Sequence, residues 1–104
     1  MLVSKYTASD KVQADGIQTI ELVEGGFKNQ IAVSGTATSG TLAFEYKAAN
    51  KWYTLNDSLG NALVVNMASN TTGYVVNGCL DAIRVTPTSI AGGTYTVEVI
   101  SEVG

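Results

Sequence analysis

Short runs of alternating apolar and polar residues recur along this chain at intervals of about ten residues, a spacing typical of antiparallel β proteins. The clearest run spans residues 41–47, where Leu42, Phe44 and Tyr46 fall on one face of an extended chain. No segment sustains the 3.6-residue apolar period of a helix. The runs that we expect to form strands cover residues 17–23, 30–37, 41–47, 51–55, 62–67, 74–78, 82–86 and 94–101.

The pattern predicts an all-β protein, an antiparallel β-sandwich or small jelly roll of about eight short strands. The twelve threonines, twelve valines and eleven glycines agree, because β-branched residues favour strands and glycine favours turns. Pro87 is the single proline, and it cannot donate a hydrogen bond into a β-ladder. We therefore expect Pro87 to end the strand that begins at residue 82.

The length of 104 residues supports one compact domain with a modest core, so we interpret residues 1–104 as a single β-sandwich domain. With 45% hydrophobic and 14% charged residues, the composition is that of a globular protein. Residues 1–15 carry a weaker pattern. Residues 9–14 stay open between one helical turn capped by Ser9, a polar loop and a short edge strand. Residues 1–6 stay open between an arm that orders against a neighbouring molecule and a disordered start, and residues 1–15 together are a candidate flexible arm.

Several kinds of chemistry are excluded by composition. Histidine is absent, which removes the side chain most often used in acid–base catalysis and metal binding. Cys79 is the only cysteine, so the chain forms no internal disulfide and no cysteine zinc site, and we expect a buried thiol. The loop at residues 56–61 lacks the second carboxylate of a calcium loop and predicts a plain turn. We predict that the protein is not an enzyme and holds no cofactor and no metal.

The charge pattern restricts the partners. The net charge of −3 argues against a nucleic-acid partner, because phosphate binding requires a basic surface. No run approaches the roughly 20 apolar residues that cross a bilayer, and the first fifteen residues lack the pattern of a signal peptide. We therefore expect no nucleic acid and no membrane partner. Asp81 and Arg84, three residues apart, predict a local surface ion pair of small energetic worth.

Four aromatic residues, Phe44, Tyr46, Trp52 and Tyr53, form the densest chemical feature of the chain. If residues 41–47 and 51–55 pair as a hairpin, alternation sends Trp52 and Tyr53 to opposite faces. A core position is favoured for Trp52, and Tyr53 stays open between the core and an exposed position. Whichever of the two is exposed is suited to anchor a protein partner or to stack on a sugar ring.

A sandwich of short strands ends in sheet edges, and unprotected edges recruit other chains. Edges rich in threonine and valine, with few lysines and one proline, carry few of the residues that prevent pairing with other chains. We therefore expect another subunit to cover an edge or a face, and we expect a homo-oligomer. The candidate interface residues are Leu2, Val3, Tyr6, Trp52 and Tyr53.

Four segments carry a resemblance to a known group of proteins. They read IAVSGTATSGTLAFEY (residues 31–46), WYTL (52–55), AIRVTP (82–87) and GGTYTVEV (92–99). A strand, a tryptophan-bearing hairpin partner and a closing Gly-Gly-Thr-x-Thr-Val-x-Val strand resemble the small β-sandwich structural proteins of tailed bacteriophages. These include head-decoration proteins, head fibres and tail accessory modules.

The resemblance implies a non-enzymatic virion structural protein, a capsid decoration, stabilising or head–tail accessory subunit that acts by subunit–subunit binding. The implied partners are other capsid or tail subunits, and the implied location is the virion after synthesis in the bacterial host cytoplasm. The alternative is a carbohydrate-binding module, in which Tyr53 or Tyr74, with Asn56 and Asp57, forms a platform for a surface glycan. A crystallin-like or immunoglobulin-like interaction domain is a third interpretation.

Overall fold

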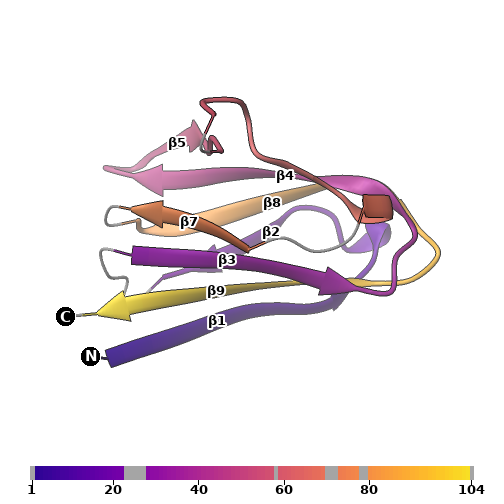
Figure 1. Ribbon diagram of the computed structural model, residues 1–104, viewed down its shortest axis with the longest axis horizontal. Helices are drawn as coiled ribbons and strands as arrows, with labels where there is room; N and C mark the ends of the chain where they lie inside the picture. The colour runs from indigo at the N-terminus through magenta and orange to yellow at the C-terminus, as the bar shows by residue number, and fades with distance from the viewer. Residues whose placement is uncertain (1, 23–27, 58, 70–72, 78–79, 104) are drawn as a thin grey trace.

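The computed structural model describes residues 2–22, 28–57, 59–69, 73–77 and 80–103, which form two antiparallel sheets packed face to face (Figure 1). The first sheet has the strand order β1-β9-β3-β7, and the second has the order β2-β8-β4-β5, with β6 also paired to β4. The strands are β1 (Leu2–Lys11), β2 (Gln18–Glu21), β3 (Lys28–Gly35), β4 (Ser39–Ala48), β5 (Lys51–Thr54), β6 (Val64–Asn66), β7 (Gly73–Asn77), β8 (Ala82–Ala91) and β9 (Tyr95–Val103). Two 3-10 turns, η1 (Gln13–Asp15) and η2 (Met67–Ser69), complete the described elements. The predicted all-β sandwich is confirmed.

The segment that the sequence left open is a strand. Each of the eight expected runs overlaps one strand, and β1 adds a ninth at residues 2–11. β1 pairs with β9 from Leu2↔Val103 to Ala8↔Val97, with an irregularity before Lys11. Residues 2–11 are thus not a free arm but an edge strand, because their backbone completes the ladder of the C-terminal strand (Figure 1).

Pro87 does not end its strand, because β8 continues to Ala91. Pro87 pairs with Leu42 of β4 on one side. On its other side the pairing with β2 has already ended at Gln18↔Val85, so this position needs no donor for a ladder. The Gln13 side chain occupies that side, since its Nε2 donates to the Pro87 carbonyl at 3.1 Å and its Oε1 accepts from the Ile90 N–H at 2.9 Å.

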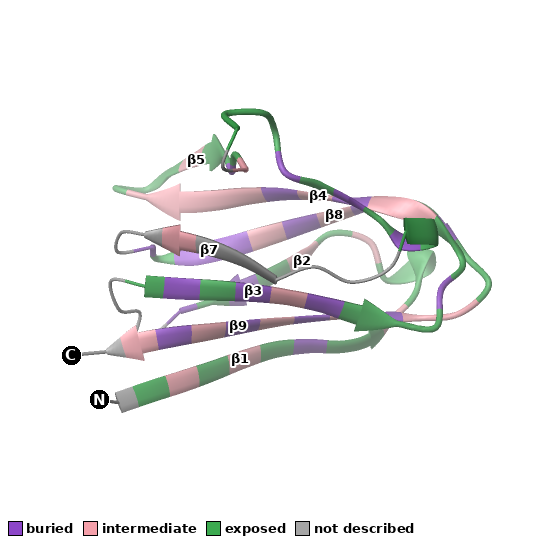
Figure 2. Cartoon of the chain, in the orientation of Figure 1, coloured by how far each residue is buried: buried purple, intermediate pink, exposed green. Residues whose placement is uncertain are grey.

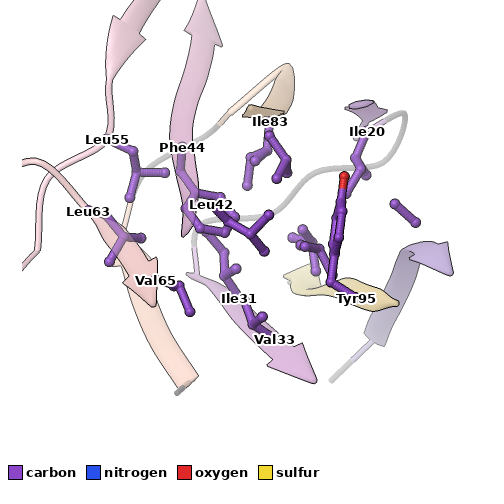
Figure 3. Packing of buried hydrophobic residues seen from close by; sticks show 14 of the residues in the cluster. Ile20, Ile31, Val33, Leu42, Phe44, Leu55, Leu63, Val65, Ile83 and Tyr95 are labelled. Atoms are coloured by element: carbon purple, nitrogen blue, oxygen red, sulfur yellow. The ribbon is translucent and has the colours of Figure 1, made fainter. Parts of the chain in front are cut away.

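The core lies between the sheets and follows the predicted alternation (Figures 2 and 3). Leu42 and Phe44 of β4 are buried, and Tyr46 packs against the same cluster from a half-buried position. Buried residues of both sheets and their connecting loops complete the cluster: Ala8, Ile20, Leu22, Ile31, Val33, Ala37, Leu55, Leu63, Val65, Met67, Leu80, Ile83, Val85, Ile90, Tyr95, Val97 and Val99. Burying each large apolar side chain stabilises the fold by about 1.5–3 kcal/mol.

Among the described residues, Tyr95 is the core side chain that carries a buried polar atom without a hydrogen-bond partner. The residue is fully buried, and its hydroxyl has no hydrogen-bond partner among the described residues. The ring lies in the core with the hydroxyl directed toward Ile20 of β2 (Figure 3). Burial, followed by the negative charge of Asp15, raises the pKa of Tyr95 above its ordinary value.

We predict that Tyr95→Phe stabilises the protein by about 1 kcal/mol near neutral pH, because the change removes a buried, unpartnered hydroxyl. A raised folded-state pKa means that the parent retains its stability below about pH 10 and loses it as the phenol ionises at higher pH. The variant lacks this loss. Urea unfolding of both proteins at pH 7 and from pH 9 upward measures the difference. A less stable variant with the parent's alkaline decline would contradict the prediction.

Candidate interaction surface

The hairpin of β4 and β5 places its two adjacent aromatic residues on opposite faces, as predicted. The register pairs Tyr46 with Tyr53 and Lys47 with Trp52. Ala49 and Asn50 form the two-residue turn, and both have positive φ angles, 51° and 63°. A two-residue turn with positive φ at both positions fits the right-handed twist of a hairpin and fixes its register.

Tyr53 lies on the core side of the sheet at its rim. Its ring stacks on that of Tyr46, with 5.4 Å between centroids and 24° between planes. Tyr53 remains 43% exposed. The open question about this residue is therefore answered: Tyr53 is an exposed aromatic that extends the core to the surface.

Trp52 lies on the outer face of the second sheet, so the core position favoured for it is wrong. The physical reason is register, because Trp52 stands opposite Lys47, whose side chain belongs to the polar face of β4. The guanidinium carbon of Arg84 lies 4.3 Å from the centre of the Trp52 ring, a cation–π contact. Trp52 is therefore half-buried by a charged neighbour and not by the core.

Arg84 pairs across strands and not along its own. Its Nε and Nη2 donate to Oε1 of Glu45 at 3.0 and 2.8 Å, and Glu45 is its register partner on β4. The predicted ion pair with Asp81 does not form, because residues three apart in an extended chain point to opposite faces. The Arg84–Glu45 ion pair is partly exposed, and its contribution to the stability of the fold is small.

The remaining candidate residues lie on β1, at the opposite edge of the molecule from β5 (Figure 1). Val3 is 50% exposed, whereas Tyr6 is half-buried and packs against the core. The backbone of Leu2 pairs with Val103, and its side chain lies outside the described residues. The structure therefore does not bring the predicted interface residues together in one site.

A groove between β1 and β2 is the feature that sequence reasoning missed. β1 is an edge of the first sheet and β2 an edge of the second, and both edges face an open groove of about 440 Å³. Ala8 and Ile20 are its buried apolar members. The groove is lined by Tyr6, Thr7, Ala8, Ser9, Lys11, Gln18, Thr19, Ile20 and Glu21. Its walls come from strands of different sheets, so no local pattern predicts it.

The loop proposed as a plain turn has that form. Oδ1 of Asp57 accepts hydrogen bonds from the N–H groups of Leu59 and Asn61 at 2.9 and 3.0 Å, which closes the loop. Within the described ranges, no group of three potential metal-ligating residues comes together. Cys79 and the side chain of Tyr74 lie outside the described residues. No described helix has the length and apolar character needed to cross a membrane.

The fold is shared with a protein of phage origin. The chain is similar to the SPBc2 prophage-derived protein YomS, with a TM-score of 0.59 and 14% identity, covering 96% of this chain and 94% of that one. It is also similar to a variant of CBM29-2, a family 29 carbohydrate-binding module, with a TM-score of 0.48 and 9% identity, covering 98% and 82%. The first likeness shows the fold alone, and the second carries no argument about ligands. No family model matches the sequence, and no curated protein matches it.

We predict that Trp52→Ala folds normally and loses only about 1 kcal/mol of stability, the worth of its contact with Arg84. The matched core change, Phe44→Ala, costs about 3–5 kcal/mol because Phe44 is 2% exposed. Chemical unfolding of both variants, followed by circular dichroism, measures the contrast. Equal losses for the two variants would place Trp52 in the core after all.

Proposed function

We propose that this protein is a non-enzymatic structural subunit of a bacteriophage particle, which acts as a capsid decoration, stabilising or head–tail accessory protein. The observation that carries the proposal is the open groove between β1 and β2, which we also call the seam because the two sheets meet there without joining. Two strand edges there leave backbone groups available on one side. Such edges favour association with other chains.

The shared fold supports this setting. YomS is a prophage-derived protein, and its fold covers nearly all of both chains. A structural subunit needs no reaction, since it stabilises an assembly by burying surface against its neighbours. On this proposal the location is the virion, and the partners are other capsid or tail subunits.

Exposed apolar side chains outside the seam support the further proposal of a homo-oligomer. Tyr53 on β5 and Val64 on β6 are 43% and 50% exposed, and both strands pair with β4 at the edge opposite β2. Exposed apolar side chains on a small domain favour contact with a second molecule. This edge is separate from the groove, so the two surfaces are able to serve different partners.

The proposal predicts that the chain is a stoichiometric component of the particle. Particles purified on a density gradient from cells that encode the protein should contain it in a fixed ratio to the major capsid or tail protein. Quantitative mass spectrometry of peptides measures that ratio. Native mass spectrometry of the purified chain measures its oligomeric state, for which we expect a closed ring or dimer.

Two outcomes would contradict the proposal. The first is recovery of the protein from the cell extract with none in the particles. The second is specific binding on a glycan array that Trp52→Ala or Tyr53→Ala abolishes while the fold is retained, which would favour the carbohydrate-binding alternative. An abundant host protein, measured in the same gradient fractions, controls for carry-over.

A further inference from the structure

The groove between β1 and β2 has the shape and the chemistry of a strand-binding site. All four residues of β2 line it, and on the opposite wall so do five residues of β1. In an antiparallel edge strand, every second residue directs its N–H and C=O away from its own sheet. β2 has β8 on one side and, among the described strands, no partner on the other. A strand is the ligand that such an edge accepts.

Two exposed apolar side chains lie at one end of the groove. Six large hydrophobic side chains are exposed in the described part of the chain, and two of them, Val12 and Ile17, belong to the segment that joins β1 to β2. Val12 and Ile17 flank η1, at one end of the groove, and are 40% and 57% exposed. Exposed apolar residues concentrated beside an open groove indicate a surface that a partner covers.

We propose that this groove binds an extended segment of a different polypeptide chain, which adds to the free edge of β2 as a further strand. The inference rests on the proposed function, since it gives the form of the contact with the particle. β2 has four residues, which span about 13 Å and match a segment of four or five residues. The bound segment alternates, with inward side chains over Ala8 and Ile20 and outward side chains in solvent.

Charge orients the bound segment. β1 and β2 follow one another across η1 and run in opposite directions, so Lys11 lies near the η1 end of the groove and Glu21 near the other end. A segment with an acidic residue beside Lys11 and a basic residue beside Glu21 complements both ends. Proline is excluded from the positions that pair with β2, because it lacks the N–H donor.

Within the described ranges, a second copy of this chain supplies no occupant. Its segments there already belong to strands, 3-10 turns or short connecting loops, so none of them is a spare extended segment. An edge strand of a second copy carries its own sheet with it. Pairing of that kind joins the edges of two whole sheets and does not add a single separate strand to β2.

The test uses the full chain and a ribosome-displayed library of random nonapeptides as the probe. We expect enrichment of peptides in which apolar and polar residues alternate. Gln18→Trp places an indole on the groove side of β2, the side that Gln18 shares with Ile20, and should weaken binding of these peptides at least about tenfold. Lys11→Glu reverses the charge at the η1 end of the groove and should weaken binding of peptides that carry an acidic residue there, so a folding defect in one variant leaves the other as the test.

The matched control is Thr54→Trp. Thr54 is exposed at the end of the cross-strand row Thr19–Arg84–Glu45–Thr54, on the outer face of the second sheet. Thr54 lies on β5, outside the groove, so Thr54→Trp should bind the enriched peptides as the parent does. Amide chemical shifts of the parent should change at residues 6–11 and 18–21 when a peptide binds.

The outcomes separate this inference from the proposed function. Failure to enrich any peptide, or peptides that bind Gln18→Trp and Lys11→Glu as tightly as the parent, would overturn the strand-binding groove. So would self-association through the groove, seen as a dimer that Gln18→Trp disrupts. If particles contain the parent and both groove variants in equal ratio, the structural role stands and the groove inference fails. If peptides bind as expected but particles lack the protein, the structural role fails and the groove stands.

Discussion

Each sheet of this protein has one apolar face, and the rest of the structure depends on burying those two faces against each other. The alternation along β3, β4, β8 and β9 puts their largest side chains into one shared layer (Figure 3). Packing face to face removes this surface from water, but it leaves the sheet edges without partners. The seam between β1 and β2 is the consequence, because the chain passes from one sheet to the other there without joining them.

The outer face of the second sheet is held by a different kind of contact. Arg84 bridges Glu45 and Trp52, so charge pairing and a cation–π contact order side chains that the core does not reach. Such contacts stabilise the fold only slightly, but they fix the positions of the side chains. The face is therefore ordered and polar, whereas the seam offers backbone groups and apolar side chains. This contrast is why we assign partner binding to the seam.

Much of the fold follows from local pattern, because side-chain alternation is a property of each strand taken alone. It predicted the eight strands from residue 17 onward and the inward positions of Leu42 and Phe44. Local alternation does not predict contacts between segments that are distant in the sequence. The side of Trp52 depends on the register set by the Ala49–Asn50 turn, and Pro87 is tolerated because Gln13, 74 residues away, occupies the vacant edge. The groove joins walls from two sheets, so only the assembled structure shows it.

Hydrogen exchange of the free protein and of the same protein in purified particles tests the central claim most directly, that the seam is where this subunit meets its partner. The account predicts that the N–H groups of β2 that point away from β8, and those of residues 6–8 that point away from β9, exchange rapidly in the free protein and become protected in the particle. Amides of the central strands β4 and β9 should be slow in both states. Unchanged exchange at the seam, with new protection at β5 or on the outer face around Trp52, would contradict the account.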